Sequence, residues 1–185
     1  MTGKKIEKLI KELQSENDKN RYKSFRVLFP LSEKEPKKLY PFWEVLVSML
    51  KKKEVSNKHY SINLISNLVA VDKQNKFEKI FKLFYGNLSH ESPVVSAHVA
   101  GNSGKIVRAK PQLEEQITKL LLDEKIRKKT RYPDLMSSYI IKAFGEYFDQ
   151  IKDKDKVVAF IKRQLDSSSP KTKKVAKEFL SKNKA

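Results

Sequence analysis

The sequence predicts an all-α fold of paired antiparallel helices, and three observations carry this prediction. Apolar residues recur at helical spacing through most of the 185 residues. The expected starts of helices return at a regular interval of about 38 residues, as in a repeat protein. The composition also favours helix over strand, with only five glycines and a charged fraction of 34% that is rich in Lys and Glu.

The apolar pattern defines each helix in turn. In the first, Ile6, Leu9, Ile10 and Leu13 form one face of a helix with a 3.6-residue period. A second stripe ends at Pro30, where we expect the helix to stop because proline lacks an N–H. No segment alternates like a strand. Further stripes of helical spacing cover residues 39–50, 60–71, 77–88, 95–106, 113–121, 135–148, 157–165 and 175–180.

Prolines at expected helix starts give the repeat interval. Pro93 and Pro170, each preceded by a serine cap, lie 77 residues apart, and Pro36 and Pro111 lie 75 apart. Both separations equal two copies of a unit of about 38 residues. We expect a single domain over residues 1–185, with further helix caps at Ser56 and Thr130. The expected helix pairs cover residues 4–52, 56–88, 92–122 and 130–166, and a terminal helix covers residues 169–182.

One stretch of the chain carries a family resemblance. Ser92-Pro93-Val94-Val95-Ser96-Ala97-His98-Val99-Ala100 combines a polar turn, a proline, a Val-rich first helix and small residues where helices touch. With a helix pair every 36 to 39 residues, the chain resembles HEAT-repeat and armadillo-like proteins over nearly its whole length. The resemblance implies a right-handed α-α superhelix (a HEAT/ARM-like solenoid) of about four antiparallel helix pairs plus a terminal helix. It also implies that the second helices line a concave face.

Charge and composition narrow the function. The chain has 40 Lys and Arg against 22 Asp and Glu, and the resulting net charge of +18 attracts polyanions and acidic surfaces. Most of these cations are Lys, which reads base edges poorly, so any anion binding is expected to be weakly specific. The absence of Cys excludes disulfides, thiolate nucleophiles and Cys-based zinc sites. The sequence contains no apolar window long enough to span a membrane, and we expect a cytoplasmic protein.

Three patterns suggest enzymes, and each has a structural alternative. Residues 101–105 (GNSGK) lack the first glycine and the final hydroxyl of a phosphate loop, so their glycines are expected to permit close helix packing or a kink. HEAT-like deoxyhypusine hydroxylases hold iron with repeated His-Glu pairs, whereas this chain has one, His90-Glu91, in an expected turn. Trp43 beside Glu44 resembles the site of HEAT-like DNA glycosylases, but Trp43 belongs to an apolar stripe. We expect no catalytic, cofactor or metal site.

Basic clusters fall in the turns expected between successive pairs, where stacked repeats would place them along one edge. Such a row of cations can follow a phosphate backbone by releasing counterions, although solvation of the turns is the favoured interpretation. Tyr132, inside the densest cluster, can stack on an unpaired base or pack on the next helix. The candidate anion or nucleic-acid contacts are Lys51, Lys52, Lys53, Lys58, Lys125, Arg127, Lys128, Lys129, Arg131, Lys171, Lys173 and Lys174.

The expected function is a non-catalytic scaffold or adaptor that recognises a protein partner through its concave helical face. The alternative is a sequence-independent DNA- or RNA-binding module that uses the Lys/Arg-rich edge, and a HEAT-like DNA glycosylase comes third. Fold alone does not give function, so the first expectation rests on the family resemblance. The candidate concave-face contacts are Lys79, Lys82, Lys119, Lys162 and Arg163.

Overall fold

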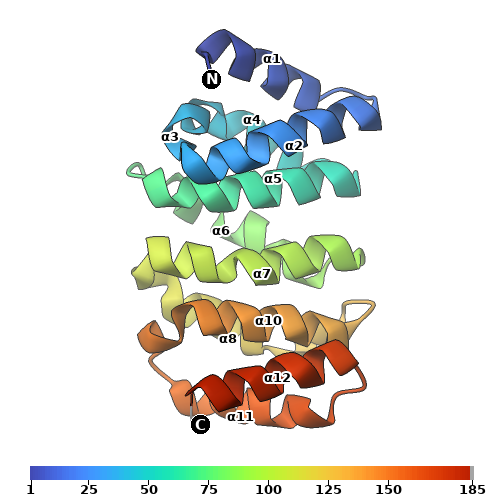
Figure 1. Cartoon of the computed structure of the whole chain (residues 1–185), viewed down its shortest axis with the longest axis vertical. Coiled ribbons are helices and arrows are strands. Elements are labelled where there is room, and N and C mark those ends of the chain that lie inside the picture. Colours follow the sequence, from blue (N-terminus) through green and yellow to red (C-terminus); the bar gives the residue numbers. More distant parts are fainter. Residues whose placement is uncertain (184–185) are drawn as a thin grey trace. The chain divides into compact units, whose positions relative to one another are not determined.

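The computed structural model describes residues 1–183 and is all-α, since helical residues make up 84% of it and no strand occurs in that range. The chain divides into two compact units, residues 1–84 and 85–185. Figure 1 shows the helices of each unit, coloured along the chain. None of the described helices is both long enough and apolar enough to cross a membrane.

The first unit pairs long helices with shorter ones. Its elements are α1 (Gly3–Leu13), α2 (Asp18–Lys34), α3 (Pro36–Leu39), η1 (Tyr40–Phe42), α4 (Trp43–Leu50), α5 (Val55–Leu68), η2 (Val69–Val71) and α6 (Lys76–Tyr85), which runs one residue past the unit. Helix α2 packs against both α1 and α5, and α4 also packs on α5. Leu28, Trp43, Leu46 and Leu64 are fully or almost fully buried there, as their apolar stripes require.

The expectation that Pro30 ends a helix is wrong. Helix α2 continues to Lys34 with Pro30 inside it. Proline cannot donate to the carbonyl of Arg26, one turn earlier, but both residues are exposed, so water can reach the freed carbonyl. The Ser32 hydroxyl then donates to the carbonyl of Phe29 at 2.6 Å and supports the next turn.

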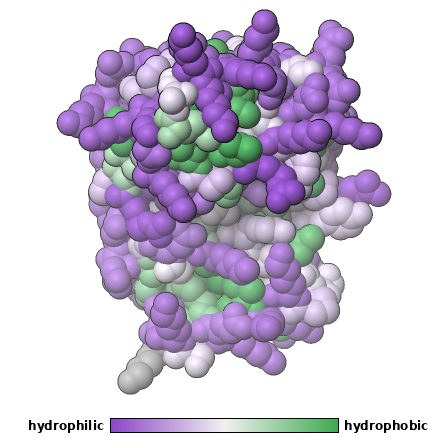
Figure 2. All heavy atoms as spheres, turned by 45° about the horizontal axis from the view of Figure 1, so that its top comes forward, coloured by the Kyte–Doolittle hydropathy of each residue, from purple (hydrophilic) through white to green (hydrophobic). Residues whose placement is uncertain are grey.

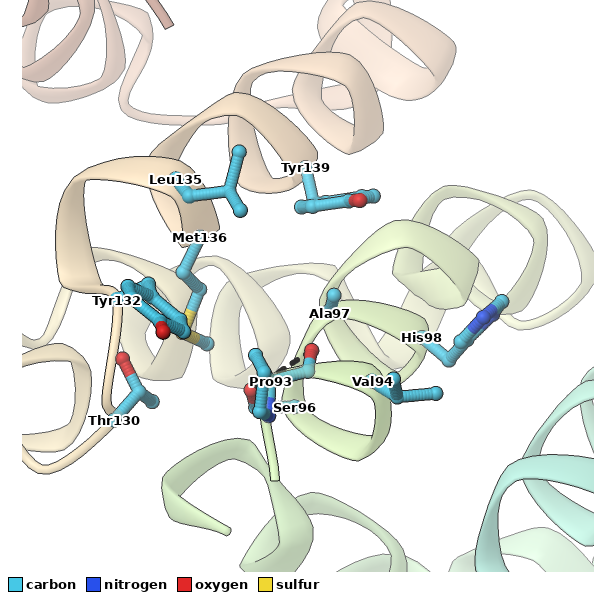
Figure 3. Close-up of a pocket in the computed structure, with 10 residues that line it drawn as sticks. All are labelled: Pro93, Val94, Ser96, Ala97, His98, Thr130, Tyr132, Leu135, Met136 and Tyr139. Atoms are coloured by element: carbon cyan, nitrogen blue, oxygen red, sulfur yellow. Dashed lines mark hydrogen bonds between the residues drawn. The ribbon is translucent and has the colours of Figure 1, made fainter. Parts of the chain in front are cut away.

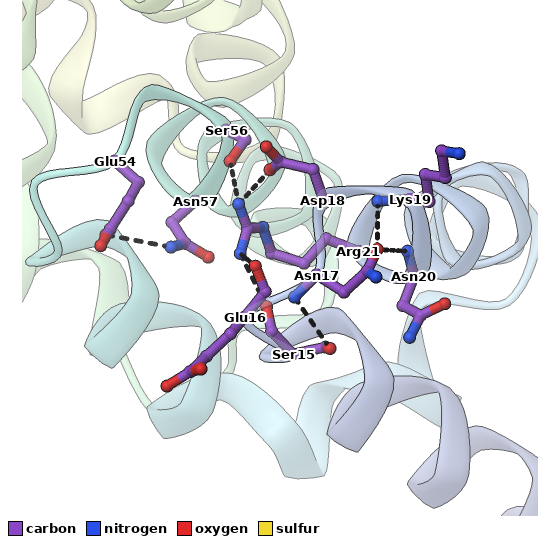
Figure 4. Close-up of polar contacts among 10 residues, drawn as sticks. All are labelled: Ser15, Glu16, Asn17, Asp18, Lys19, Asn20, Arg21, Glu54, Ser56 and Asn57. Carbon is purple, nitrogen blue, oxygen red and sulfur yellow. Dashed lines mark hydrogen bonds and ion pairs between the residues drawn. The ribbon is translucent and has the colours of Figure 1, made fainter.

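A buried arginine ties the α1–α2 turn to the start of α5 (Figure 4). The Arg21 guanidinium donates to the carbonyls of Ser15 (2.7 Å) and Glu16 (3.0 Å), and to the Ser56 hydroxyl at 3.2 Å. It also forms an ion pair with Asp18 on its own helix. Ser56 therefore accepts from Arg21 and does not cap α5, whose N-cap residue is Glu54.

The second unit contains three long helices, with α10 packed between α7 and α12 (Figure 1). The shorter helices connect them, and the buried core includes Ile106, Ile140, Phe144 and Phe160. The elements are η3 (Gly86–Ser89), α7 (Pro93–Ala109), η4 (Pro111–Leu113), α8 (Glu114–Leu122), α9 (Glu124–Lys128), α10 (Pro133–Tyr147), η5 (Phe148–Gln150), α11 (Lys154–Arg163), η6 (Gln164–Asp166) and α12 (Pro170–Asn183).

Prolines mark helix starts as expected, but the caps differ. Pro93 and Pro170 are the first residues of α7 and α12. The Ser169 hydroxyl accepts from the backbone N–H of Thr172 at 3.3 Å and caps α12, whereas Ser92 makes no side-chain cap bond. Thr130 does not start a helix either, because its hydroxyl donates to the Arg127 carbonyl and α10 begins at Pro133.

Helices α7 and α10 approach each other closely at Gly104. A Cβ at this position would lie 2.6 Å from the Glu146 Cβ, closer than side chains pack. At Gly101, one turn earlier, the nearest atom to such a Cβ would be Tyr139 Cδ1 at 3.7 Å, an ordinary contact. The expectation that glycine permits close packing here is confirmed at Gly104.

Candidate functional site

Hydrophilic side chains cover most of the face shown in Figure 2, and apolar atoms appear there in separate patches. In the first unit, Lys51, Lys52 and Lys53 are exposed where α4 ends. Lys58 differs, because its ammonium donates to the Leu50 carbonyl at 3.0 Å and partial burial lowers its pKa. The Lys58 side chain therefore supplies a hydrogen-bond donor to a carbonyl at the C-terminal end of α4.

The two basic clusters of the second unit meet at one end of α10 and α12. The Asp134 carboxylate, in the first turn of α10, accepts from the Ser168 N–H at 2.9 Å and from the Ser168 hydroxyl. The Thr172 hydroxyl in α12 donates to the Asp134 carbonyl at 2.6 Å. The hydrogen bonds from Ser168 hold the pKa of the Asp134 carboxyl below its usual range. We call the exposed cations of these two clusters the basic edge: Lys125, Lys128, Lys129, Arg131, Lys171, Lys173 and Lys174.

Not every cation of this region is free for a ligand. The Arg127 guanidinium lies 5.0 Å from the centre of the Phe160 ring, and partial burial lowers its pKa. Arg127 therefore belongs to the packing between α9 and α11. Lys128 pairs with Glu124 at 2.9 Å, whereas the Lys174–Glu178 contact is longer at 3.9 Å. Such exposed ion pairs contribute little and open readily.

An apolar groove lies between α7 and α10 (Figure 3). In Figure 3, Val94 and Ala97 come from α7, and Met136 and Tyr139 come from α10. Val94 is 43% exposed and Tyr132 is 47% exposed, although both are large apolar side chains. The hollow measures about 230 Å³, and no Asp, Glu, Lys or Arg is among the residues that line it. The residues of this α7–α10 groove are Pro93, Val94, Ser96, Ala97, His98, Thr130, Tyr132, Leu135, Met136 and Tyr139.

Cations of the basic edge border this groove. The Lys171 ammonium lies 4.2 Å from the centre of the Tyr139 ring, and the Arg131 guanidinium lies 5.4 Å from the Tyr132 ring. Lys129 and Arg131 also line a shallower hollow beside Pro93, at the start of α7, together with one acid, Glu91. Cations outnumber this acid around the groove, which therefore combines an apolar floor with a rim of net positive charge.

The candidate contacts on the second helices are all exposed. Lys79 and Lys82 lie on α6 of the first unit, Lys119 lies on α8, and Lys162 and Arg163 lie on α11. Lys119 lines a hollow between α8 and the start of α11. We call it the α8–α11 hollow.

A buried carboxylate lines the α8–α11 hollow. Glu114 is 3% exposed, and its Oε1 accepts from the Thr118 hydroxyl at 2.9 Å. The Tyr147 hydroxyl lies 3.0 Å from the Thr118 oxygen. Burial raises the pKa of Tyr147, so its phenol stays protonated.

The residues whose patterns suggested enzymes make structural contacts, in the core or in a turn. Trp43 is 1% exposed and packs beside Tyr40, with ring centres 5.8 Å apart. His90 accepts a hydrogen bond from the backbone N–H of Ser92 in the turn before α7. Within residues 1–183, no three His, Cys, Asp or Glu side chains gather closely enough to hold a metal ion.

Sequence reasoning did not select Glu114, Val94 or the apolar side of the groove. A signal for Glu114 existed, because residues 114, 118 and 121 share one helix face and Leu121 belongs to the apolar stripe. A Glu and a Thr on such a face indicate a buried polar pair. Val94 stands beside Val95, and the sequence alone does not tell which of the two is buried; Val95 is fully buried and Val94 is 43% exposed.

Comparisons with known proteins give no family. No family model matches the chain, and no curated protein matches it. Among solved structures, one described as the crystal structure of an engineered protein, a Northeast Structural Genomics Consortium target, aligns with 95% of this chain and 97% of its own. The two are 12% identical, with a TM-score of 0.46. A TM-score this low assigns neither fold nor function.

Proposed function

We propose that this chain is a non-catalytic binding module that holds an acidic segment of a protein partner in the α7–α10 groove. One observation carries the proposal: Val94 and Tyr132, the two large apolar side chains exposed among residues 85–183, line the same hollow. Exposed apolar side chains that gather in one place mark interaction sites, whereas scattered ones do not. The hollow is large enough for one apolar anchor of the partner.

The charge around the groove selects the partner's chemistry. Lys129, Arg131 and Lys171 border the apolar floor, so acidic residues on both sides of an apolar anchor would complement it. Such rim charges contribute more to specificity and association rate than to affinity. The anchor supplies most of the binding free energy.

The proposal includes a HEAT-like arrangement of helix pairs. The long first helices begin at residues 18, 55, 93, 133 and 170, which gives intervals of 37, 38, 40 and 37 residues. Such a period is typical of repeats that stack their helix pairs. In this arrangement the groove lies between the first helices of two successive repeats.

Selection of peptides from a random library tests the proposed function. The library is selected on the wild-type protein and the enriched peptides are measured by calorimetry. We expect sequences with a bulky apolar residue flanked by Asp or Glu. Val94→Asp should weaken their binding at least tenfold, because it places a negative charge at the apolar floor.

Val27→Asp is the matched control, since Val27 is 38% exposed on α2 of the other unit. It makes the same chemical change outside the groove and should leave the affinity unchanged. Enriched peptides without acidic residues, or equal losses in both variants, would contradict the proposal.

A sequence-independent nucleic-acid-binding module is the second candidate, and the basic edge favours it. The contacts of Asp134 with Ser168 and Thr172 join the start of α10 to the start of α12, and both starts carry a Lys-rich cluster. Phosphates held by such cations give binding that falls steeply with salt. Tyr132, exposed beside Arg131, offers a ring on which an unpaired base can stack.

Titration with a labelled DNA duplex and a labelled single strand, at low and near-physiological salt, separates the two candidates. A linear fall of log affinity with log salt, with a slope of several phosphates, would make nucleic-acid binding the lead. Tyr132→Ala should then weaken binding of the single strand more than binding of the duplex. Binding that vanishes near physiological salt would leave the protein-binding proposal in place.

A further inference from the structure

The α8–α11 hollow contains an acceptor that no donor among residues 1–183 reaches. This hollow measures about 600 Å³ and lies between α8 and the start of α11, on other helices than the α7–α10 groove. Its size is that of a site for a small ligand or for one long side chain.

A chain of hydrogen bonds fixes the Glu114 carboxylate. Thr118 has a single hydroxyl proton and gives it to Glu114 Oε1, 2.9 Å away. The hydrogen bond of 3.0 Å between Thr118 and Tyr147 must therefore be donated by the phenol. The order is Tyr147 to Thr118 to Glu114, which holds the carboxylate as an acceptor in one orientation.

The second oxygen of this carboxylate has no partner. Glu114 Oε2 is buried, and no donor among the described residues reaches it. Glu114 also forms none of the ion pairs of residues 1–183. A buried acceptor without a donor is costly, so a cation that reached Oε2 would gain an unusually strong interaction.

The other acids around the hollow are already engaged. Glu115 pairs with Lys152 at 3.3 Å, and Asp153 pairs with Lys156. The Asp123 Oδ1 accepts from the backbone N–H groups of Lys125 and Ile126 and caps α9. Among the carboxylates of the hollow, Glu114 is therefore the one whose buried oxygen has no partner within residues 1–183.

We propose that the α8–α11 hollow binds a guanidinium group, which donates to Glu114 Oε2. A guanidinium is weakly hydrated, and its planar donors match a fixed carboxylate better than an ammonium does. The ion pair of Lys152 and Glu115 lines the same hollow. The Lys152 side chain is 74% exposed and that of Glu115 is 77% exposed, so this surface pair opens at little cost when a ligand enters.

The first test needs no variant. The wild-type protein, labelled with ¹⁵N, is titrated with N-acetyl-arginine amide and with its neutral isostere N-acetyl-citrulline amide. We expect millimolar binding of the arginine compound, with shifts confined to the amides of residues 114–123 and 152–156. The citrulline compound should bind at least tenfold more weakly, because it lacks the positive charge and the planar fork of donors of a guanidinium. Equal affinity for the two compounds, or shifts located elsewhere, would overturn the proposal.

Glu114→Gln then tests the residue. Glutamine keeps the shape of the side chain and removes its charge, so arginine binding should weaken at least tenfold. Asp166→Asn is the matched control, since Asp166 is an exposed acid of η6 outside the hollow and the net charge changes equally. Loss of arginine binding in the control, or its retention in Glu114→Gln, would contradict the role of Glu114.

Two sources can supply the guanidinium, and a third titration distinguishes them. Free arginine is compared with a capped five-residue peptide that carries one central arginine among glycines. Tighter binding of the peptide supports an arginine side chain of a protein partner, whereas equal or tighter binding of the free amino acid supports a small-molecule ligand. Absence of binding by both would overturn the site. The variants in the α7–α10 groove should leave all three titrations unchanged, so the two proposals stand or fall separately.

Discussion

Trp43 is the residue at which an enzymatic and a structural interpretation of the sequence diverge. It is 1% exposed in the core of the first unit, where a glycosylase would need it on an open face. We expect Trp43→Ala to lower the free energy of unfolding by about 3 to 5 kcal/mol, the range for large side chains removed from a core. Urea denaturation measures this loss. Tyr22→Ala, which truncates an exposed aromatic residue of the same unit, should cost much less, and equal costs would contradict the core assignment.

Tyr40 gives a residue-scale prediction in alkaline solution. Burial and the hydrogen bond that its hydroxyl donates to Asp72 (2.6 Å) raise the pKa of Tyr40 to about 12. Because the folded-state pKa lies above the unfolded value near 10, the contribution of Tyr40 is fully present below about pH 10 and is lost as pH rises towards about 12.

The Tyr40→Phe variant isolates this contribution. It should be less stable than the wild type by about 1 kcal/mol at neutral pH, from the lost hydrogen bond. The difference should shrink between about pH 10 and 12, measured by urea denaturation at several pH values. A difference that stays constant or grows over that interval would show that Tyr40 does not titrate as described.

At the scale of elements, the contact of α7 with α10 predicts opposite effects for two neighbouring glycines. Gly104→Ala must push the helices apart, since the new Cβ would lie 2.6 Å from Glu146 Cβ, and we expect a loss of about 1 to 3 kcal/mol. Gly101→Ala meets only an ordinary contact and should gain about 0.5 to 1 kcal/mol from higher helix propensity. Thermal denaturation of the two variants compares them, and the same sign of change in both would contradict the close approach.

Elements were predictable wherever local chemistry decides them. Prolines without a donor suit the first turn of a helix, and the expected starts at Pro93 and Pro170 are confirmed. Pro30 misled the same reasoning, because an exposed proline can remain inside a helix whose other contacts hold it. The cap at Ser56 failed because its hydroxyl accepts from Arg21, 35 residues away, a contact that depends on tertiary structure. The cap at Thr130 failed for a local reason, since its hydroxyl donates to the Arg127 carbonyl three residues earlier and α10 begins only at Pro133.

The candidate sites were less predictable than the helices. The charge clusters of the second unit are visible in the sequence, but their union depends on the bonds of Asp134 with Ser168, 34 residues away. The α7–α10 groove depends on two helices that meet in space and leave Val94 and Tyr132 uncovered. Glu114 could have been found by its place on an apolar helix face, but its unpaired oxygen becomes visible only with all neighbours in position.

At the scale of the whole molecule, the positive charge is spread evenly. Residues 1–84 carry 19 Lys and Arg against 10 Asp and Glu, and residues 85–185 carry 21 against 12, so each unit has a net charge of +9. A field of this kind attracts any polyanion at long range, whichever surface binds it. Salt distinguishes long-range attraction by the net charge from direct contact of cations with a ligand. The Debye length falls from about 30 Å at 0.01 M to about 8 Å at 0.15 M, so added salt screens the long-range attraction.

Two quadruple variants with the same net charge test whether the basic edge is a binding surface or part of this field. Near 0.01 M salt, both should slow association with a DNA duplex to a similar extent, because both lower the total charge by four. Near 0.15 M, only the edge variant should lose further affinity, since screening leaves only cations in contact with phosphate to contribute. Equal losses at both salt concentrations would show that the edge has no role beyond its charge. The edge variant replaces Lys129, Arg131, Lys171 and Lys173 by Ala, and the control replaces the exposed Lys4, Lys5, Lys11 and Lys23.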